Sequence, residues 1–253
     1  MSFGLALGGG AARGHAHVGV LSALEAAGLR PSHLAGTSAG AIVAGLYAFG
    51  VGVDEIESAA GEFTWRDVAG ISLKRTGLLS NRELGDICED LLGPVDLRDA
   101  AIPLAVVTTD ITNGERVVFT DGPLSRVVRA SAAVPGVFEP VEIGDRQLVD
   151  GGLVENVPVA ALRELGAATV VAVTLDTGLD FQTPRSLVPI LINAFQIAVS
   201  TASEAYIRDA ADVVIRPDLR HFTHWNTKDG AAIRREGQRA GEAAVEAIRT
   251  AQR

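Results

Sequence analysis

The serine in GTSAG, residues 36–40, is the residue of this chain best suited to nucleophilic chemistry. An apolar run ends at Ala35 and a helix rich in small residues follows, so Ser38 is expected on a tight strand-to-helix turn. A G-x-S-x-G turn of this kind exposes a serine nucleophile. Gly36 and Gly40 permit the strained backbone and the close approach that it needs. The new helix directs free N–H groups and the positive end of its dipole at the reacting oxygen.

A carboxylate in the middle of the chain is the natural partner for this hydroxyl. Residues 146–149 predict a short strand, and Asp150, Gly151 and Gly152 follow at its end. Asp-Gly is a common turn pair, so taken alone this segment reads as a turn. However, it lies at the carboxyl end of a strand, where α/β sheets place their ligands. Because Ser38 lies on a turn of the same kind, the two side chains are expected to meet.

Residues 8–14, GGGAARG, form a glycine-rich loop before a helix. Such a loop offers backbone N–H groups to an anion. The alternative is a dinucleotide-binding turn, G-x-G-x-x-G. Beginning at Gly8 that pattern requires glycine at Arg13, and beginning at Gly9 it requires glycine at Ala11. No acidic residue follows at a strand end about 20 residues later, so the sequence favours an anion site over a nucleotide site.

The elements that must position these residues alternate as a largely parallel sheet requires. Strands are expected at residues 3–7, in the run that ends at 35, and at 102–109, 116–120, 146–149, 168–175 and 213–215. Helices are expected at residues 15–27, 38–49, within 78–93, within 123–138, and at 186–210 and 234–249. Asp54 is expected as the N-cap of a further short helix, and Pro135 is expected to stop the helix within 123–138.

With ASAAVP at residues 130–135, these segments resemble the motifs of the patatin-like phospholipases. That family has a glycine-rich loop followed by R-G, a G-T-S-A-G elbow, an A-S-x-A-x-P stretch and a D-G-G motif, in this order. Here the last motif reads DGGLVENVP from Asp150. The match extends from roughly residue 3 to 160. The short form is similar to the bacterial type related to the catalytic domain of neuropathy target esterase.

The resemblance implies a three-layer α/β fold, with a mostly parallel central sheet and helices on both faces. At 253 residues the chain suits a single patatin-like domain over residues 1–253. In the family the region that corresponds to residues 65–93 is variable and often covers the site, so it is a candidate cap.

The resemblance also implies a dyad in which Ser38 is the nucleophile and Asp150 the base. An exposed carboxylate, with a pKa near 3.9, is too weak a base, so Asp150 has to be desolvated and close to the hydroxyl. Gly151 and Gly152 leave room for that packing. The resemblance assigns the oxyanion to backbone N–H groups of the glycine-rich loop, at Gly9, Gly10 and Ala11.

Two residues of the loop have alternative interpretations. Arg13 either supplies positive charge near the oxyanion or a phosphate head group, or pins the loop by hydrogen bonds to carbonyls. The structural role is favoured, because backbone donors already serve the oxyanion. Ala11 replaces the second glycine of the family's pattern; we expect little loss, provided that its φ is negative.

Histidine offers a second mechanism. In the Ser…Asp…His order of α/β-hydrolases, His221 or His224 of HFTHWN would complete a triad. His15 and His17 are two residues apart and do not share a helix face, so they are unsuited to bind a metal. No carboxylate or histidine cluster has ligand spacing, and we expect neither metal nor cofactor.

Composition restricts the partners. A net charge of −9 lacks the electrostatic footprint of a nucleic-acid-binding protein. It also gives no general attraction to anionic membranes, so any transient peripheral contact with lipid should be local and apolar. LVPILINAFQIAV, at residues 187–199, is the most apolar surface candidate, although a core-facing helix explains it better. Cys88 is the single cysteine and excludes an internal disulfide. Without a signal-like or membrane-spanning stretch, a cytoplasmic location is expected.

These observations predict a serine acyl-ester hydrolase. It would act on phospholipids, lysophospholipids or related lipid esters through an acyl-serine intermediate. Without an imidazole to protonate an amine leaving group, esters are favoured over amides. The alternatives are an acyltransferase that uses the same acyl-enzyme, and a lipid-binding or regulatory module with little turnover. The sequence leaves the head group, the acyl length and position, and the oligomeric state open.

Overall fold

The computed structural model describes residues 2–62, 80–176, 187–223 and 227–253. Its strands are β1 (Gly4–Leu7), β2 (His33–Thr37), β3 (Leu104–Asp110), β4 (Arg116–Phe119), β5 (Val141–Ile143), β6 (Arg146–Asp150), β7 (Val170–Val173) and β8 (Val213–Ile215). Its α-helices are α1 (His15–Ala26), α2 (Ala39–Ala48), α3 (Val53–Glu62), α4 (Arg82–Leu92), α5 (Leu124–Ser131), α6 (Gly152–Glu155), α7 (Val159–Glu164), α8 (Leu187–Ala210) and α9 (Gly230–Ala251). Short 3₁₀ turns are η1 (Ala11–Gly14), η2 (Leu97–Asp99) and η3 (Thr227–Asp229).

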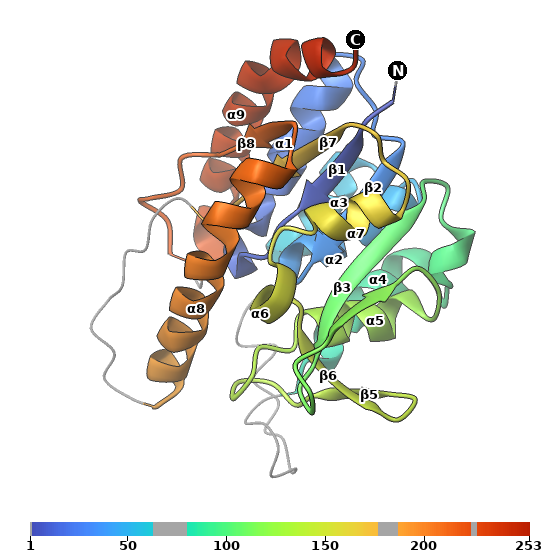
Figure 1. The fold of residues 1–253 in the computed structure, drawn as a ribbon, viewed down its shortest axis with the longest axis vertical. Coiled ribbons are helices and arrows are strands. Elements are labelled where there is room, and N and C mark those ends of the chain that lie inside the picture. The colour runs from blue at the N-terminus through green and yellow to red at the C-terminus, as the bar shows by residue number, and fades with distance from the viewer. Residues whose placement is uncertain (1, 63–79, 177–186, 224–226) are drawn as a thin grey trace.

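One mixed sheet of eight strands organises the described residues, in the order β5-β6-β3-β2-β1-β7-β8, with β4 also paired to β3 (Figure 1). Five strands, β3-β2-β1-β7-β8, are mutually parallel. The strands β4, β5 and β6 add antiparallel pairs at one side. The predicted mostly parallel sheet is therefore confirmed, and β5 is a strand that the sequence analysis missed.

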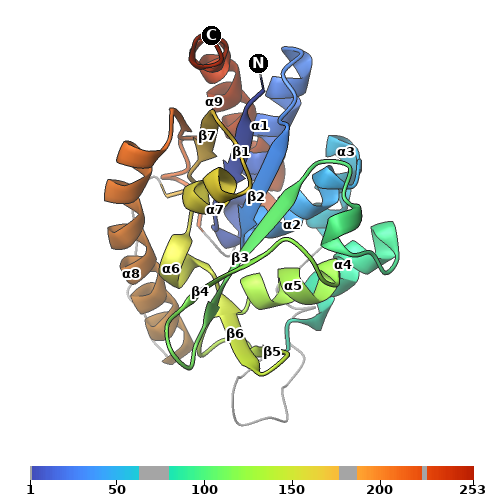
Figure 2. The ribbon, with the colours of Figure 1, turned by 45° about the vertical axis from the view of Figure 1, so that its right-hand side comes forward.

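Helices cover both faces of the sheet, as predicted for a three-layer fold. Figure 2 shows α2–α5 on one side of the sheet and α7 and α8 on the other. The first face is bulky: residues of β1, β2 and β7 pack there with α1, α2 and α9. The second face is lined by alanines in register across four strands, at positions 105, 35, 6 and 172. These small side chains let α7 pack close to the sheet.

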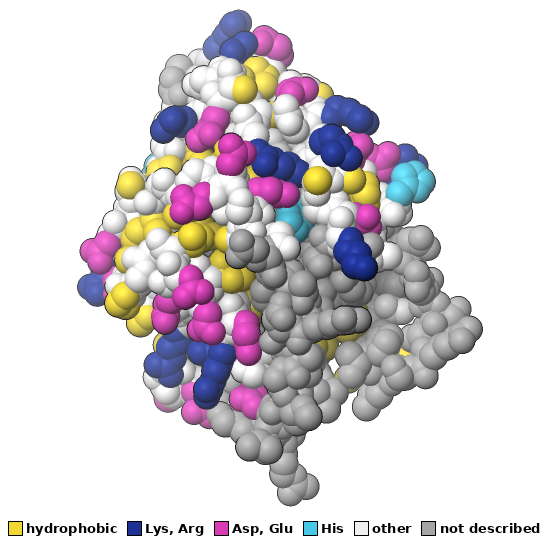
Figure 3. Space-filling model, turned by 180° about the vertical axis from the view of Figure 1, so that it is seen from behind, with side chains coloured by type: hydrophobic (Ala, Val, Ile, Leu, Met, Phe, Trp, Pro, Cys, Tyr) yellow, Lys and Arg dark blue, Asp and Glu magenta, His cyan; other side chains and the backbone are white. Residues whose placement is uncertain are grey.

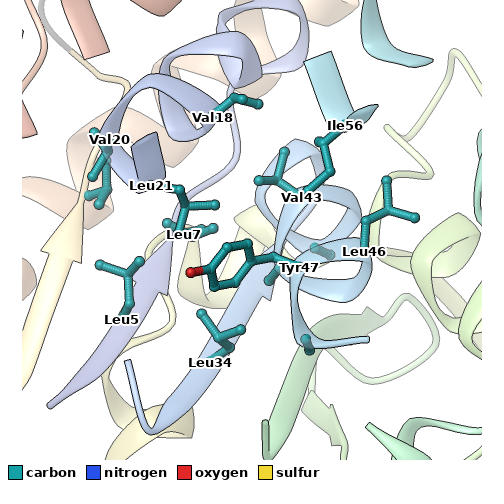
Figure 4. Close-up of a cluster of buried hydrophobic side chains, with 14 of the residues drawn as sticks. Leu5, Leu7, Val18, Val20, Leu21, Leu34, Val43, Leu46, Tyr47 and Ile56 are labelled. Atoms are coloured by element: carbon teal, nitrogen blue, oxygen red, sulfur yellow. The ribbon is translucent and has the colours of Figure 1, made fainter. Parts of the chain in front are cut away.

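The main core lies between the first face and its helices (Figure 4). Leu7 of β1 lies beside Leu21 of α1, and Leu34 of β2 lies beside Tyr47 of α2. These central strands are apolar at successive positions because both of their faces are covered. The carboxyl ends of β1 and β2 are thus rigidly held, and the glycine-rich loop and Ser38 follow directly from them.

Two expected helix boundaries were wrong. Asp54 is not an N-cap: α3 begins one residue earlier, and the carbonyl of Gly52 accepts the N–H of Ile56 at 3.0 Å. Asp54 lies in the first turn, where its charge complements the helix dipole. The helix expected to run to Pro135 ends at Ser131. Proline has no N–H to donate to the carbonyl four residues earlier, so it ends the helix at that carbonyl.

The candidate cap at residues 65–93 lies partly outside the described residues, because residues 63–79 are not described. Its second part contains α4, which confirms the amphipathic helix expected within residues 78–93. On the molecule's rear side, acidic and basic side chains are interspersed rather than gathered by sign (Figure 3). In the described part of the chain, no helix combines the length and the hydropathy required to cross a bilayer.

Candidate active site

Ser38 occupies the sharp turn between β2 and α2. Its backbone has φ 54° and ψ −123°, a left-handed conformation that is strained for a residue with a side chain. This is the nucleophile-elbow geometry that the sequence predicts. Gly40 makes the turn possible because a Cβ there would lie 2.0 Å from the carbonyl oxygen of Leu7. A Cβ on Gly36 would lie 2.6 Å from the carbonyl oxygen of Gly40.

The register of β3 brings Asp150 to Ser38. The last residue of β2, Thr37, pairs with Val107, and the last residue of β6, Asp150, pairs with the next residue, Thr108. Because β4 occupies the other edge of β3 at both positions, β2 and β6 share one edge. Ser38 continues from β2 at the point where β6 ends. The two side chains therefore meet, and the Ser38 hydroxyl donates a hydrogen bond to the Asp150 carboxylate.

The Asp150 carboxylate is almost completely buried, with 2% of the residue exposed. Burial raises its pKa to about 6, although the N–H of Gly152 and the hydroxyl of Ser38 both donate to it and oppose the rise. The Gly152 N–H lies 2.8 Å from Oδ1. Gly151 allows the turn, since a Cβ there would lie 2.3 Å from the carbonyl oxygen of Val107. A carboxylate of this pKa is a better base near neutral pH than an exposed one.

The ASAAVP segment holds the elbow and the aspartate together. The Ser38 N–H donates to Ser131 Oγ at 2.8 Å, and Ser131 Oγ donates to the carbonyl of Val107 at 2.7 Å. The carbonyl of Ala133 accepts the N–H of Asp150 at 2.9 Å. Ser131 is a positioning residue that the sequence analysis quoted in a motif without giving it a role. Its buried hydroxyl fixes the backbone on which Ser38 stands.

The glycine-rich loop faces Ser38, but its first expected donor is occupied. The N–H of Gly9 donates to the carbonyl of Asn156 at 3.1 Å, so Gly9 does not offer a free donor. The N–H groups of Gly10 and Ala11 have no acceptor among the residues that the structure describes. Both residues line the same pocket as Ser38. Gly10 and Ala11 at the start of η1 are therefore the candidates for binding an oxyanion.

Ala11 does not meet the condition under which its replacement of glycine was expected to be harmless. Its φ is +50°, in the left-handed region, at the first residue of η1. In this conformation the Cβ of alanine causes steric strain, which glycine avoids because it has no Cβ.

We predict that Ala11→Gly stabilises the protein by roughly 0.5–1 kcal/mol. Glycine removes the strain of the left-handed conformation, and its greater freedom in the unfolded chain cancels part of that gain. Urea denaturation would measure the difference, with Ala12→Gly in the same turn as the matched control that should destabilise. A lower midpoint for Ala11→Gly would contradict the prediction.

Arg13 lies beneath the loop rather than in the pocket. It is 1% exposed, and its guanidinium donates to the carbonyl of Phe222 at 2.8 and 3.0 Å and to that of Leu175 at 3.2 Å. These contacts connect the glycine-rich loop to the ends of two distant segments. Of the two interpretations of Arg13, this geometry favours the pinning of the loop.

The histidines are arranged in a way that does not favour a triad. His17 is buried and donates from Nε2 to the carbonyl of Gly8 at 2.7 Å; burial lowers its pKa to about 4, so it is neutral near pH 7. His15 lies in the apolar wall near Glu57. His221 is exposed and lines neither pocket at Ser38. His224 lies outside the described residues.

Two pockets meet at Ser38. The first, of about 110 Å³, is apolar and extends between α1, α2, α3 and α4; its walls include Val18, Ile42, Leu46 and Ile87. The second, of about 70 Å³, contains the polar groups and is bordered by α8. The two share Ser38, Ala11 and Val134. An ester bound at Ser38 would thus find an apolar space on one side and a polar space on the other.

Asn156 is a further residue of the polar pocket that the sequence analysis did not single out. It is 8% exposed, and its Oδ1 lies 2.6 Å from where a Cβ on Gly9 would be. Its side chain therefore stands between the glycine-rich loop and the DGG turn. The signal was present in DGGLVENVP, where Glu155 and Asn156 are the polar residues between the apolar pairs LV and VP. Among the described residues, no group of three histidine, cysteine, aspartate or glutamate side chains is suited to hold a metal.

The fold and the site define an α/β protein in which a serine on a strained elbow faces a buried aspartate. A profile of the patatin-like phospholipase family matches residues 5–163. The chain belongs to this family, as its motifs predict.

Relatives agree with this assignment. An uncharacterised NTE family protein of Mycobacterium tuberculosis is 39% identical over 175 residues, which cover 68% of this chain and 48% of that protein. The neuropathy target esterase sws of Drosophila melanogaster is 33% identical over 180 residues, 68% of this chain and 13% of that protein. The lysophospholipase NTE1 of Scheffersomyces stipitis is 33% identical over 189 residues, 72% of this chain and 12% of that protein. The chain thus spans about half the length of the mycobacterial relative and about an eighth of the others.

Among solved structures, VipD from Legionella pneumophila superposes with a TM-score of 0.57 at 15% sequence identity. The match covers 97% of this chain and 67% of VipD. At this identity the similarity concerns the fold, and it confirms the predicted α/β architecture.

Proposed function

We propose that this protein is a serine acyl-ester hydrolase for phospholipids, lysophospholipids or related lipid esters. The observation that carries the proposal is the hydrogen bond from the Ser38 hydroxyl to a buried Asp150 whose pKa is raised to about 6. The names of the relatives, a neuropathy target esterase and a lysophospholipase, support a lipid ester as the substrate.

The proposed mechanism is a dyad. Asp150 takes the proton of Ser38 as Oγ attacks the ester carbonyl, and the oxyanion binds to the N–H groups of Gly10 and Ala11. Collapse of the intermediate breaks the ester bond, and Asp150 returns the proton to the leaving alcohol. Water then attacks the acyl carbonyl and gives a proton to Asp150; the bond from the acyl carbon to Ser38 Oγ breaks, Asp150 returns the proton to Oγ, and the fatty acid leaves. No imidazole takes part in this sequence.

The proposal assigns the two pockets to the two halves of the ester. The leaving oxygen must lie near Asp150, which lines the polar pocket and not the apolar one. The alcohol therefore occupies the polar pocket. The acyl chain occupies the apolar pocket, where burial of its methylene groups supplies binding energy of about 0.8 kcal/mol each.

We expect a fluorophosphonate probe to label the wild type at Ser38 and to leave Ser38→Ala unlabelled. Ser58→Ala is the matched control, because the Ser58 hydroxyl donates to the carbonyl of Asp54 at 2.9 Å within α3 and has no part in the dyad. A lipid panel analysed by mass spectrometry would follow the products. Fatty acid release that depends on Ser38 supports a hydrolase, whereas acyl transfer to an added alcohol in place of release indicates an acyltransferase. Lipid binding without labelling would overturn the proposal in favour of a binding module.

The proposal includes transient contact with a lipid surface through α8. Ile190 and Ile197 are 48% and 47% exposed, and seven residues apart they share one face of the helix. Other residues of α8, including Phe195 and Val199, line the polar pocket. The helix thus joins the site to an apolar outer face, which suits the local apolar contact that the net charge of −9 favours.

Replacing both exposed isoleucines with glutamine, Ile190→Gln with Ile197→Gln, should lower hydrolysis of zwitterionic vesicles by at least about tenfold, because each isoleucine loses apolar burial in the lipid. The rate at which the same double variant hydrolyses a water-soluble ester should change little. Ala243→Gln with Ala247→Gln is the control, since these exposed residues lie on α9 at the other end of the molecule (Figure 1). Equal losses on both substrates would contradict a surface role.

A further inference from the structure

The polar pocket at Ser38 is acidic. Two of its walls carry carboxylates, Asp150 at the end of β6 and Asp176 shortly after β7. Its other described polar side chains, apart from Ser38 itself, are neutral: Asn156, Gln196 and Ser200. Among the described residues that line it, there is no lysine, arginine or histidine.

Asp176 is held at this wall by its backbone. Its N–H donates to Thr174 Oγ1 at 3.3 Å, and Thr174 is 1% exposed at the end of β7. The side chain is half-buried, and no salt bridge within the described part of the chain neutralises it. The carboxylate therefore contributes to the pocket a negative charge that no ion pair between described residues offsets.

Arg13 does not offset this charge toward a bound ligand. Its guanidinium is buried behind the glycine-rich loop and directs its donors at the carbonyls of Leu175 and Phe222. It lines neither pocket. A phosphate in the polar pocket would thus meet carboxylates, and it would find no described cation within the lining.

We infer that the site selects esters by the charge of their alcohol, and that Asp176 is the specificity-determining residue. This inference rests on the proposed function, in which the leaving alcohol occupies the polar pocket beside Asp150. The favoured substrates carry a neutral alcohol, or a head group whose cation balances its phosphate, such as choline. Alcohols with a net negative charge are disfavoured, because like charges within several ångströms repel in a partly desolvated pocket.

The test compares three lysolipids with the same acyl chain: a monoacylglycerol, a lysophosphatidylcholine and a lysophosphatidylglycerol. All are presented in neutral detergent micelles, so that the charge of a membrane surface does not contribute. For the wild type, kcat/KM for the neutral and zwitterionic substrates should exceed that for the anionic one by about tenfold. Asp176→Asn should reduce this ratio by about fivefold, and Asp176→Lys should bring it to one or below.

Asp99→Asn is the matched control, because it removes the same charge from an exposed residue of η2, which contacts β3 and lines neither pocket at Ser38. Its substrate ratio should equal that of the wild type. Thermal melting checks that each variant is folded. A wild type that prefers the anionic lipid, or an Asp176→Asn ratio equal to that of the wild type, would overturn the inference while leaving the hydrolase intact. Absence of Ser38-dependent turnover on every ester, including a p-nitrophenyl ester, would overturn both.

Discussion

Asp150→Asn should lower ester turnover by about 10³-fold and, at pH 8, make the protein more stable than the wild type. The loss of turnover follows from the loss of the base that we propose accepts the Ser38 proton. The gain in stability follows from burial: the carboxylate is 2% exposed, and burial raises its pKa from 3.8 to about 6. An asparagine Oδ1 can still accept the N–H of Gly152 without carrying a buried charge.

The raised pKa fixes the direction of the pH dependence. Between pH 4 and 6 the folded protein keeps a proton on Asp150 that the unfolded chain has released. The stability that this proton provides is complete below pH 4 and is lost as the pH rises through 6. Two pKa units correspond to about 3 kcal/mol, so the free energy of unfolding of Asp150→Asn should exceed that of the wild type by up to about 3 kcal/mol at pH 8, and by little at pH 4.

Denaturant unfolding at both pH values measures this difference in stability. Independently, kcat/KM of the wild type should fall about tenfold per pH unit below pH 6, as Asp150 becomes protonated. Ser38→Ala is the control: it is equally inactive, but it keeps the carboxylate and removes one of its hydrogen bonds, so it should show no gain at pH 8. A variant Asp150→Asn that is less stable than the wild type at pH 8 would contradict a desolvated base.

Much of the fold and the two residues of the proposed dyad could be predicted from local sequence patterns. The parallel strands were predicted because strands covered on both faces are continuous apolar runs, as in β1 and β3. Ser38 and Asp150 were singled out because each lies at the end of a predicted strand, beside glycines that a tight turn requires. In the structure Ser38 does occupy such a turn, with a strained φ of 54°.

What escaped prediction depends on contacts between distant segments. Whether the Gly9 N–H was free depended on the carbonyl of Asn156, almost 150 residues later, which takes it. Ser131 received no role from the sequence because its hydroxyl accepts the N–H of Ser38, which lies 93 residues earlier in the chain. Periodicity and propensity describe local preferences, and they do not specify which distant carbonyl a given N–H meets.

Arg13→Met should lower the free energy of unfolding by about 3–5 kcal/mol. The guanidinium donates to two carbonyls, of Leu175 and Phe222, from a site that is 1% exposed. Hydrogen bonds from charged donors contribute about 1.5–3 kcal/mol each, and both acceptors would be left without their partner. Chemical denaturation of the variant beside the wild type measures the loss.

Arg13→Lys distinguishes pinning of the loop from a catalytic charge. Lysine keeps the positive charge but not the planar fork, which donates twice to Phe222 and once to Leu175. If Arg13 stabilises the oxyanion by its charge, Lys should restore turnover and Met should not. If Arg13 pins the loop, both variants should be less stable than the wild type. The kcat of the folded fraction of each variant should then fall by less than about tenfold, because Gly10 and Ala11 still present their N–H groups. We expect the second outcome, since the guanidinium lies behind the loop that we propose binds the oxyanion, and it lines neither pocket at Ser38.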